Sequence, residues 1–330
     1  MERTTYRDPK VVELIKSKYL TVRVDQDANP DLSNRYGDWG WPATIIFAPD
    51  GTELVKWRGY IPPENMASLL EAVIADPTPG PSVTNEADVV PSATHVLTKE
   101  QRTELATRMK DAYDDKFGGW GEGHKLIEPD SMDWALSEAE RGNSAAAAMA
   151  RQTLDAALAL IDREGGGIYQ YSDEADWKSP HYEKIMWFHA QGLRQYSAAY
   201  ALWRDPRYLA AARNLYRYLA TDLTGPNGAF FTSQDADVDE RLDGKTYYAM
   251  TLAERRKTGR QPRIDKSIYA RENGWAISAL VALYNVTADP TVLANAERAA
   301  NWVVANRAIT GGGFRHGDKD MPHHVQVIAP

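Results

Sequence analysis

The 330-residue sequence predicts an α+β protein of two domains, in which a small α/β domain is followed by a larger all-helical one. Its length exceeds the roughly 250 to 300 residues at which single hydrophobic cores stop growing. Helical and strand periodicities alternate as far as residue 76, a proline-rich stretch follows, and only helical periodicity comes after it. We therefore expect domains at 1–76 and 98–330, joined by a linker at 77–97.

The composition excludes several classes of partner. The 38 basic and 46 acidic residues give a net charge of −8 without a basic stripe, so no nucleic-acid partner is expected. No apolar stretch approaches the ~20 residues that span a bilayer, and no signal peptide is visible, so we expect a soluble chain that is cytoplasmic by default, although an upstream signal stays possible. Cysteine is absent, which excludes disulfides and thiolate chemistry within the chain. We predict no cofactor and no metal, and leave protein partners open.

The first domain combines helical and strand patterns. Apolar residues in the stretch PKVVELIKSKY have helical spacing, LTVRVD alternates as a strand does, and the turn APDG separates two further strand patterns. The strands at 20–25 and 43–47 should belong to one sheet, with a gap between them. We expect helices at 9–19, 29–37 and 62–74, and strands at 20–25, 43–47 and 53–60.

The second domain contains two interleaved repeats. Asp205-Pro206 and Asp289-Pro290 each begin a helix in similar segments, with aspartate as the N-cap and proline in the first turn. Four Gly-aromatic loops, GGWGEG, GGGIYQYS, NGAFFTSQ and GGGFRHGD, each follow a helix. Recurrent helical hairpins predict a toroid with these loops at one end. We expect helices at 99–116, 131–141, 144–163, 181–203, 206–221, 249–257, 273–287 and 291–307.

These motifs resemble one family along most of the chain. The matching segments include VDQDANPDL, GWPATIIFAPDG, GGGIYQYSDEADWKSPHYEKIMWFHAQ, GAFFTSQDADVD and YARENGWAISAL. They resemble the bacterial YyaL-like proteins and the spermatogenesis-associated thioredoxin-like protein of animals. The resemblance implies a thioredoxin-like domain followed by a six-hairpin (α/α)6 barrel.

The resemblance also implies a sequence that is truncated at both ends. In the family a Cys-x-x-Cys-His element is followed almost at once by a sequence like Met1-Glu2-Arg3, so the redox motif is expected upstream of this start. The alternative is a degenerate thioredoxin scaffold that only packs or binds. About eight helices are visible where a six-hairpin barrel needs twelve, and the final DKDMPHHVQVIAP departs from the family pattern.

Trp41 and Pro42 are the candidate scaffold of a redox site. By resemblance, Pro42 matches the cis proline that lies opposite the thiols in thioredoxin-like folds. The alternative is an ordinary trans proline at the start of a strand.

His181, Glu183, Asp235 and Asp237 are the candidate catalytic residues. Ser179 and Pro180 fit the N-cap and first position of a helix, which would place His181 in its first turn. Family members carry His, Glu and Lys at the positions of His181, Glu183 and Lys184. Asp235 and Asp237 share a face if their segment is extended, and paired carboxylates suit acid–base work, sugar binding or a hard cation. Capping, packing or a solvated acidic loop are the alternatives.

Tyr171, Trp177, His189 and Asn273 are the candidate substrate-binding residues. His189 lies on the apolar stripe of its helix and therefore points to the interior, where a core histidine is the alternative to a site residue. Glu272 is a weaker candidate because the family usually has Trp there. His316, His323 and His324 have no ligand-like spacing and are read as tail residues.

Three functions remain open. Six-hairpin relatives include sugar epimerases and glycosidases, which suggests a sugar-like ligand processed by His and carboxylate groups. A thiol–disulfide or redox-sensing protein would need cysteines upstream of Met1, and a non-catalytic binding module needs neither. Tyr171, Trp177, His181, Glu183, Asp235 and Asp237 should line one pocket if the first function holds.

Overall fold

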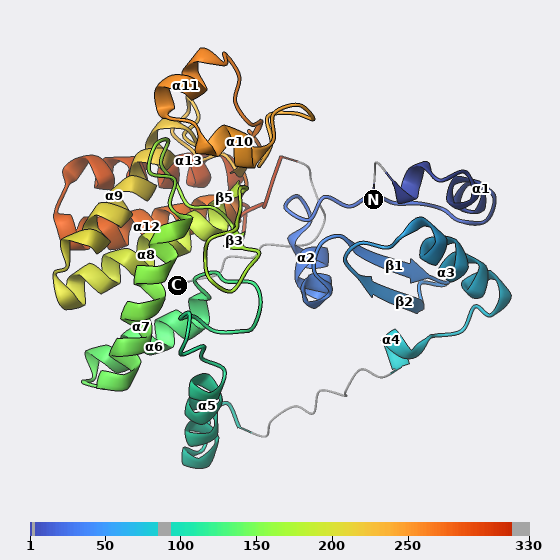
Figure 1. Cartoon of the computed structure of the whole chain (residues 1–330), viewed down its shortest axis with the longest axis horizontal. Coiled ribbons are helices and arrows are strands. Elements are labelled where there is room, and N and C mark those ends of the chain that lie inside the picture. The colour runs from blue at the N-terminus through green and yellow to red at the C-terminus, as the bar shows by residue number, and fades with distance from the viewer. Residues whose placement is uncertain (2–3, 85–93, 319–330) are drawn as a thin grey trace. The chain divides into compact units, whose positions relative to one another are not determined.

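The computed structural model describes residues 1, 4–84 and 94–318, and the chain divides into two compact units, Met1–Val96 and Leu97–Pro330 (Figure 1). Residues 85–93 of the expected linker, and positions 2–3 of the Met1-Glu2-Arg3 motif, lie outside the described residues. The described start of the linker forms the short helix α4 (Pro81–Thr84). The backbone N–H of Gly80 donates to the carbonyl of Leu54, so this part of the expected linker packs on the first unit.

The first unit contains one β-hairpin and two packed helices. The strands β1 (Ala43–Phe47) and β2 (Glu53–Arg58) are antiparallel, with Ala43 opposite Arg58. The helices α1 (Pro9–Lys18) and α3 (Pro63–Ala75) pack together, and α2 (Pro30–Tyr36) precedes the hairpin. The Trp41–Pro42 peptide is cis, as expected. The buried core consists of Val11, Ile46, Leu54, Ile61, Met66, Ala67, Leu70 and Val73.

The prediction of a strand at 20–25 is wrong. This segment forms no strand, and Leu20 and Val22 are 95% and 77% exposed. Its alternating pattern suits a strand, but a strand also needs a hydrogen-bonded neighbour, and β1 pairs only with β2 among the described residues. The predicted sheet that joins this segment to 43–47 is therefore absent from the described part of the chain.

The second unit is built from helical hairpins. The helix α8 packs against α6, α9 and α12, and α12 also packs against α13 (Figure 1). The buried side chains of these helices form one apolar core. The helices are α5 (Lys99–Asp111), α6 (Pro129–Glu140), α7 (Ser144–Ala157), α8 (Met186–Trp203), α9 (Pro206–Thr221), α10 (Gly244–Ala249), α11 (Leu252–Lys257), α12 (Ala270–Thr287) and α13 (Pro290–Arg307).

Side-chain caps fix where α7, α9 and α13 begin. Asn143, Asp205 and Asp289 each accept a backbone N–H of the first turn. Arg204 and Ala288, which end α8 and α12, have left-handed backbone conformations with φ of 55° and 53°. The α8–α9 and α12–α13 turns therefore each pass through a left-handed residue that is followed by a capping aspartate, and the Asp-Pro repeats predicted these two caps.

Two predicted helices differ from the structure. The helix expected at 181–203 begins only at Met186, because residues 180–181 and 184–185 pair as strands. The helix expected at 249–257 is instead two short helices, α10 and α11, which break at Met250 and Thr251. The side chain of Thr251 caps α11 within a capping box that includes Glu254.

The packing of α12 gives a direct test of this core. Leu280 is completely buried, whereas its neighbour Val281 is 37% exposed. We expect Leu280→Ala to lower the free energy of unfolding by about 2 to 5 kcal/mol because it leaves a cavity. Val281→Ala, the matched control, should change it by about 0.5 kcal/mol or less. Equal costs in chemical denaturation would contradict this placement of the helix.

Candidate functional site

Two of the Gly-aromatic loops, GGGIYQYS and NGAFFTSQ, lead into short strands that precede α8 and α12. Strand β3 (Tyr171–Ser172) pairs with β4 (Pro180–His181), so that Tyr171 lies opposite His181. Strands β5 (Lys184–Ile185), β6 (Ser233–Gln234) and β7 (Ile264–Asp265) form a second small sheet, in which Lys184 lies opposite Gln234. Segments far apart in sequence therefore meet at this end of the helical unit.

His189 fixes the loop in front of α8. Its Nε2 accepts the N–H of Ile168 at 3.0 Å, so the proton lies on Nδ1, which donates to the carbonyl of Ile185 at 2.9 Å. The side chain is fully buried, and burial lowers its pKa to about 3, so that the imidazole is neutral. The structure thus gives His189 the role of a core histidine that shapes the loop.

Asn273 does the same for the loop in front of α12. Its Oδ1 accepts the N–H of Phe230 at 2.8 Å, and its Nδ2 donates to the carbonyls of Phe230 and Tyr269. It is completely buried. The amide side chain therefore holds the loop backbone and presents no group to a ligand.

Trp177 is likewise a core residue in this structure. It is 2% exposed, its indole Nε1 donates to the carbonyl of Phe117 at 2.9 Å, and its ring lies against Gly119. Gly119 has φ of 85°, and a Cβ there would lie 2.9 Å from the Trp177 ring. This tight fit anchors one Gly-aromatic loop, and it leaves no ring face for a sugar.

His181 lies in strand β4 and not in the first turn of a helix, so that prediction is wrong. The N–H of Gln170 donates to the carbonyls of His181 and Glu183 at 3.2 and 2.9 Å. The neighbouring loop thus supplies strand partners to residues that the Ser-Pro pattern assigned to a helix. His181 consequently gains no helix-dipole contact from α8.

His181 and Glu183 form a half-exposed pair beside an aromatic ring. The distance from His181 Nε2 to Glu183 Oε2 is 3.8 Å, and the two side chains are 40% and 39% exposed. The imidazole stacks on Tyr171 with 4.8 Å between ring centroids and 6° between planes. Tyr171 in turn contacts His124 at 5.1 Å. Two titratable groups and an aromatic surface thus lie together at the solvent boundary.

The charges of Asp235 and Asp237 both affect the pKa of Glu183. Burial raises the pKa of Glu183, His181 opposes that rise, and the charges of Asp235 and Asp237 add to it. The pairing of Lys184 with Gln234 accounts for the influence of Asp235, because Glu183 and Asp235 directly adjoin these paired residues at the same end of the two antiparallel strands. The four candidate catalytic residues are therefore electrostatic neighbours.

Asp235 and Asp237 differ in their other partners. Arg263 donates from Nε to Asp235 Oδ2 at 3.0 Å, whereas Asp237 Oδ1 accepts the N–H of Gly244 at 2.7 Å. Gly244 begins α10, so Asp237 connects this site to the α10–α11 segment. The Asp235 side chain remains 39% exposed despite its contact with Arg263, and Asp237 is exposed as well.

The weaker candidates Glu272 and His316 both have partners within the protein. Glu272 is buried and accepts hydrogen bonds from Arg271. His316 stacks on Tyr269 at 4.6 Å. His323 and His324 lie outside the described residues. Among residues 4–84 and 94–318, no three His, Asp or Glu side chains gather as the ligands of a metal ion would.

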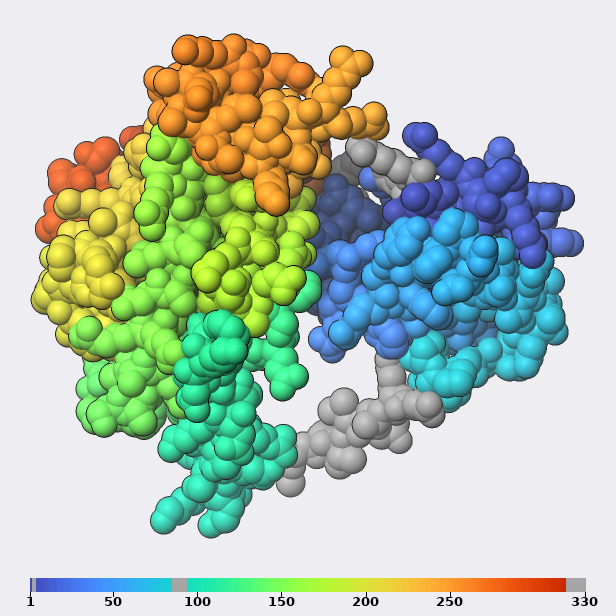
Figure 2. Space-filling view, in the orientation of Figure 1, coloured from blue at the N-terminus to red at the C-terminus, as the bar shows by residue number. Residues whose placement is uncertain are grey.

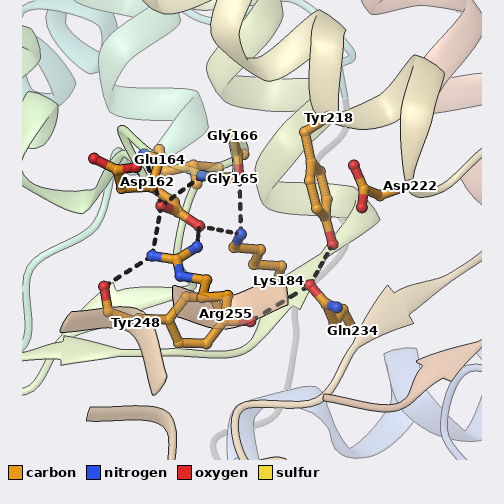
Figure 3. Close-up of polar contacts among 12 residues, drawn as sticks. Asp162, Glu164, Gly165, Gly166, Lys184, Tyr218, Asp222, Gln234, Tyr248 and Arg255 are labelled. Carbon is orange, nitrogen blue, oxygen red and sulfur yellow. Dashed lines mark hydrogen bonds and ion pairs between the residues drawn. The ribbon is translucent and has the colours of Figure 1, made fainter. Parts of the chain in front are cut away.

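A buried ionic cluster beneath the site was missed by the sequence analysis. Asp162, Lys184 and Arg255 are 2%, 2% and 4% exposed and are joined by hydrogen bonds (Figure 3). Asp162 directly precedes a Gly-rich loop, which is a signal that sequence reading could have used. Arg255 lies in the basic run ERRK, which looks like an exposed helix and offers no such signal.

Comparison with known proteins agrees with the motifs. Residues 1–74 match the model of a thioredoxin-like domain. Spermatogenesis-associated protein 20 of Homo sapiens is 25% identical over 301 residues, which cover 77% of this chain and 37% of that protein, and the Mus musculus protein is 24% identical over 294 residues. The chain is therefore similar to these proteins along most of its length, and residues 1–74 are similar to a thioredoxin-like domain. It spans about a third of the length of these curated relatives.

The α+β fold class with a thioredoxin-like first domain is thereby confirmed. Among solved structures, cellobiose 2-epimerase from Bacillus thermoamylovorans is 17% identical with a TM-score of 0.49, covering 64% of this chain and 56% of that one. An α-1,6-mannanase variant from Salegentibacter is 18% identical with a TM-score of 0.45, covering 66% and 55%. Likeness at this level carries no conclusion about activity. In the described parts of the chain, no helix is long and apolar enough to cross a bilayer.

The raised pKa of Glu183 has a measurable consequence for stability. The folded state holds this proton more tightly than the unfolded chain does, so the ionised carboxylate costs stability once the pH rises above the ordinary glutamate value. We expect Glu183→Gln to raise the Tm at pH 7 and to leave it nearly unchanged at pH 4, where the wild-type carboxyl is protonated in both states. Glu174→Gln, at an exposed position, serves as the control. A lower Tm for Glu183→Gln at pH 7 would contradict this account of the site.

Proposed function

We propose that the helical unit binds a carbohydrate-like ligand beside Tyr171 and transfers protons to and from it with Glu183 and His181. The observation that carries the proposal is the environment of Glu183, a half-buried carboxyl group with a raised pKa, 3.8 Å from an imidazole. A carboxyl group that keeps its proton closer to neutral pH suits general acid catalysis.

The neighbouring charges assign complementary roles. Asp235 is ion-paired with Arg263, whereas Glu183 has no such cationic partner among the described residues and its pKa is raised by burial. Two neighbouring carboxyl groups in such different surroundings can divide into a proton donor and a base. His181 is placed to exchange a proton with Glu183 between turnovers, because its Nε2 lies 3.8 Å from Glu183 Oε2, a gap that one water molecule can bridge.

Tyr171 supplies the surface that a sugar ring needs. It is partly exposed and stacked on His181, so its position is fixed beside the acid–base pair. Aromatic side chains offer a large apolar face at little cost in side-chain entropy, and the apolar faces of pyranose rings pack on such surfaces. Binding at this ring would bring sugar hydroxyl groups to Glu183.

A binding panel tests the proposal. Monosaccharides and disaccharides of glucose and mannose are added to the full chain, and saturation-transfer NMR reports which protons contact the protein. We expect at least one sugar to bind, Tyr171→Ala to weaken its binding by roughly 3- to 10-fold, in line with about 0.5 to 1.5 kcal/mol for an aromatic contact, and Glu183→Gln to retain it.

Glu183→Gln should abolish turnover of any sugar that the wild type converts, as followed by NMR of the products, whereas the exposed-site control Glu174→Gln should convert it normally. Absence of binding across the panel, or equal binding by Tyr171→Ala, would overturn the proposal for this site.

A thiol–disulfide function is the second candidate, and the match of residues 1–74 to a thioredoxin-like domain favours it. No side chain of this chain can perform the exchange, because cysteine is absent and the reaction requires a thiolate. Translation of the coding sequence upstream of Met1 decides this candidate: a Cys-x-x-Cys codon pattern in frame would support it, and its absence would refute it.

A further inference from the structure

The Asp162 carboxylate collects donors from three separate segments. Its Oδ2 accepts from Lys184 Nζ at 2.8 Å and from Arg255 Nη1 at 2.6 Å (Figure 3). Its Oδ1 accepts from Arg255 Nη2 and from the backbone N–H groups of Glu164 and Gly165, each at 3.1 Å. A single carboxylate therefore joins the loop after α7, strand β5 and helix α11.

The cluster contains two cations for one carboxylate. Burial alone would raise the pKa of Asp162, but Lys184 and Arg255 outweigh it and hold that pKa below its ordinary value. Burial lowers the pKa of Lys184 to about 8, and Asp162 opposes that fall. The ammonium group also donates to the carbonyl of Gly166 at 2.7 Å and faces the Tyr218 ring at 4.5 Å. Every partner is thus supplied from inside the protein.

Hydrogen bonds on the same buried side of the small sheet also hold β6, the strand that pairs with β5. Gln234, the cross-strand partner of Lys184, accepts from Tyr218 Oη at 2.9 Å and donates from Nε2 to the carbonyl of Pro262 at 3.2 Å. Figure 3 shows Lys184 and Gln234 on this one side of the sheet. Successive strand residues point to opposite faces, so Glu183 and Asp235 point the other way, toward the candidate site.

Arg255 also attaches the α10–α11 segment. Its Nη2 donates to the carbonyl of Tyr248 at 2.8 Å and its Nε to that of Met250 at 3.1 Å, while the N–H of Leu252 donates to Glu164. This segment is drawn in orange at one edge of the helical unit in Figure 2. It begins at Gly244, the partner of Asp237.

We propose that Asp162, Lys184 and Arg255 are positioning residues, whose shared network holds β5, β6 and the α10–α11 segment so that Glu183 faces Asp235 and Asp237. They touch no ligand themselves. The inference rests on the proposed function for the chemistry of Glu183, but its test does not, because the test follows a titration and not a turnover.

The test is Arg255→Met, which removes one cation and leaves the neutral pair of Asp162 and Lys184. The titration midpoint of Glu183 is measured by carboxyl ¹³C NMR on the glutamate-labelled full chain, with the resonance assigned through Glu183→Gln. Loss of a cation alone would raise this midpoint, because less positive charge remains nearby. Loss of position, with Glu183 more solvated and farther from the aspartates, lowers it toward the ordinary value. We expect the fall.

Arg256→Met is the matched control, because Arg256 is exposed on the same helix and carries the same charge. It should leave the midpoint unchanged. Arg255→Lys keeps the charge but loses the two-pronged contact with Asp162, so it should lower the midpoint by a smaller amount, and it reports on the same question if Arg255→Met does not fold. An unchanged or raised midpoint in the folded Arg255 variants would overturn the proposal, whereas failure of the sugar panel would overturn only the proposed function.

Discussion

A carboxylate removed from water must be matched by donors inside the protein, and Asp162 meets this constraint with two cationic side chains and two backbone N–H groups. These donors come from the Gly-rich loop after α7, the short strand β5 and the helix α11. The hydrogen bonds to this one carboxylate therefore hold three segments together. Each of these segments adjoins a residue of the candidate site. The geometry of Glu183 on the open face of the sheet therefore depends on a charge balance on its buried face.

Much of the helical unit could be predicted from sequence because its signals are local. The Asp-Pro pairs at Asp205 and Asp289 cap helices with their own side chains, and the cap requires only residues that are adjacent in the chain. The strand pattern at 20–25 failed because a strand depends on a distant partner that local alternation does not report. His181 was misplaced for the same reason, since its strand partner, Tyr171, lies ten residues earlier in the chain across a loop.

The candidate site was only partly visible in the sequence. The residue types of His181, Glu183, Asp235 and Asp237 suggested acid–base chemistry, and the structure makes the other three electrostatic neighbours of Glu183. Sequence could not separate exposed residues from those that hold the loops. His189 and Asn273 have polar side chains suited to ligands, yet all of their hydrogen bonds go to loop backbone. Arg255 was hidden because burial of one arginine within a basic run follows from tertiary packing alone.

The central claim is that Glu183 and Asp235 share one small volume on the open face of the sheet. A double-mutant cycle with Glu183→Gln and Asp235→Asn measures it through the free energies of unfolding at pH 7 and again at pH 3, and the cycle cancels the separate loss of the Arg263 contact. We predict that the ionised pair repels at pH 7, so that the two substitutions together stabilise the chain less than the sum of their separate effects. This coupling should disappear at pH 3, where the Glu183 carboxyl group is protonated. Additive effects at pH 7 would show that the two carboxylates do not face each other and would contradict the account.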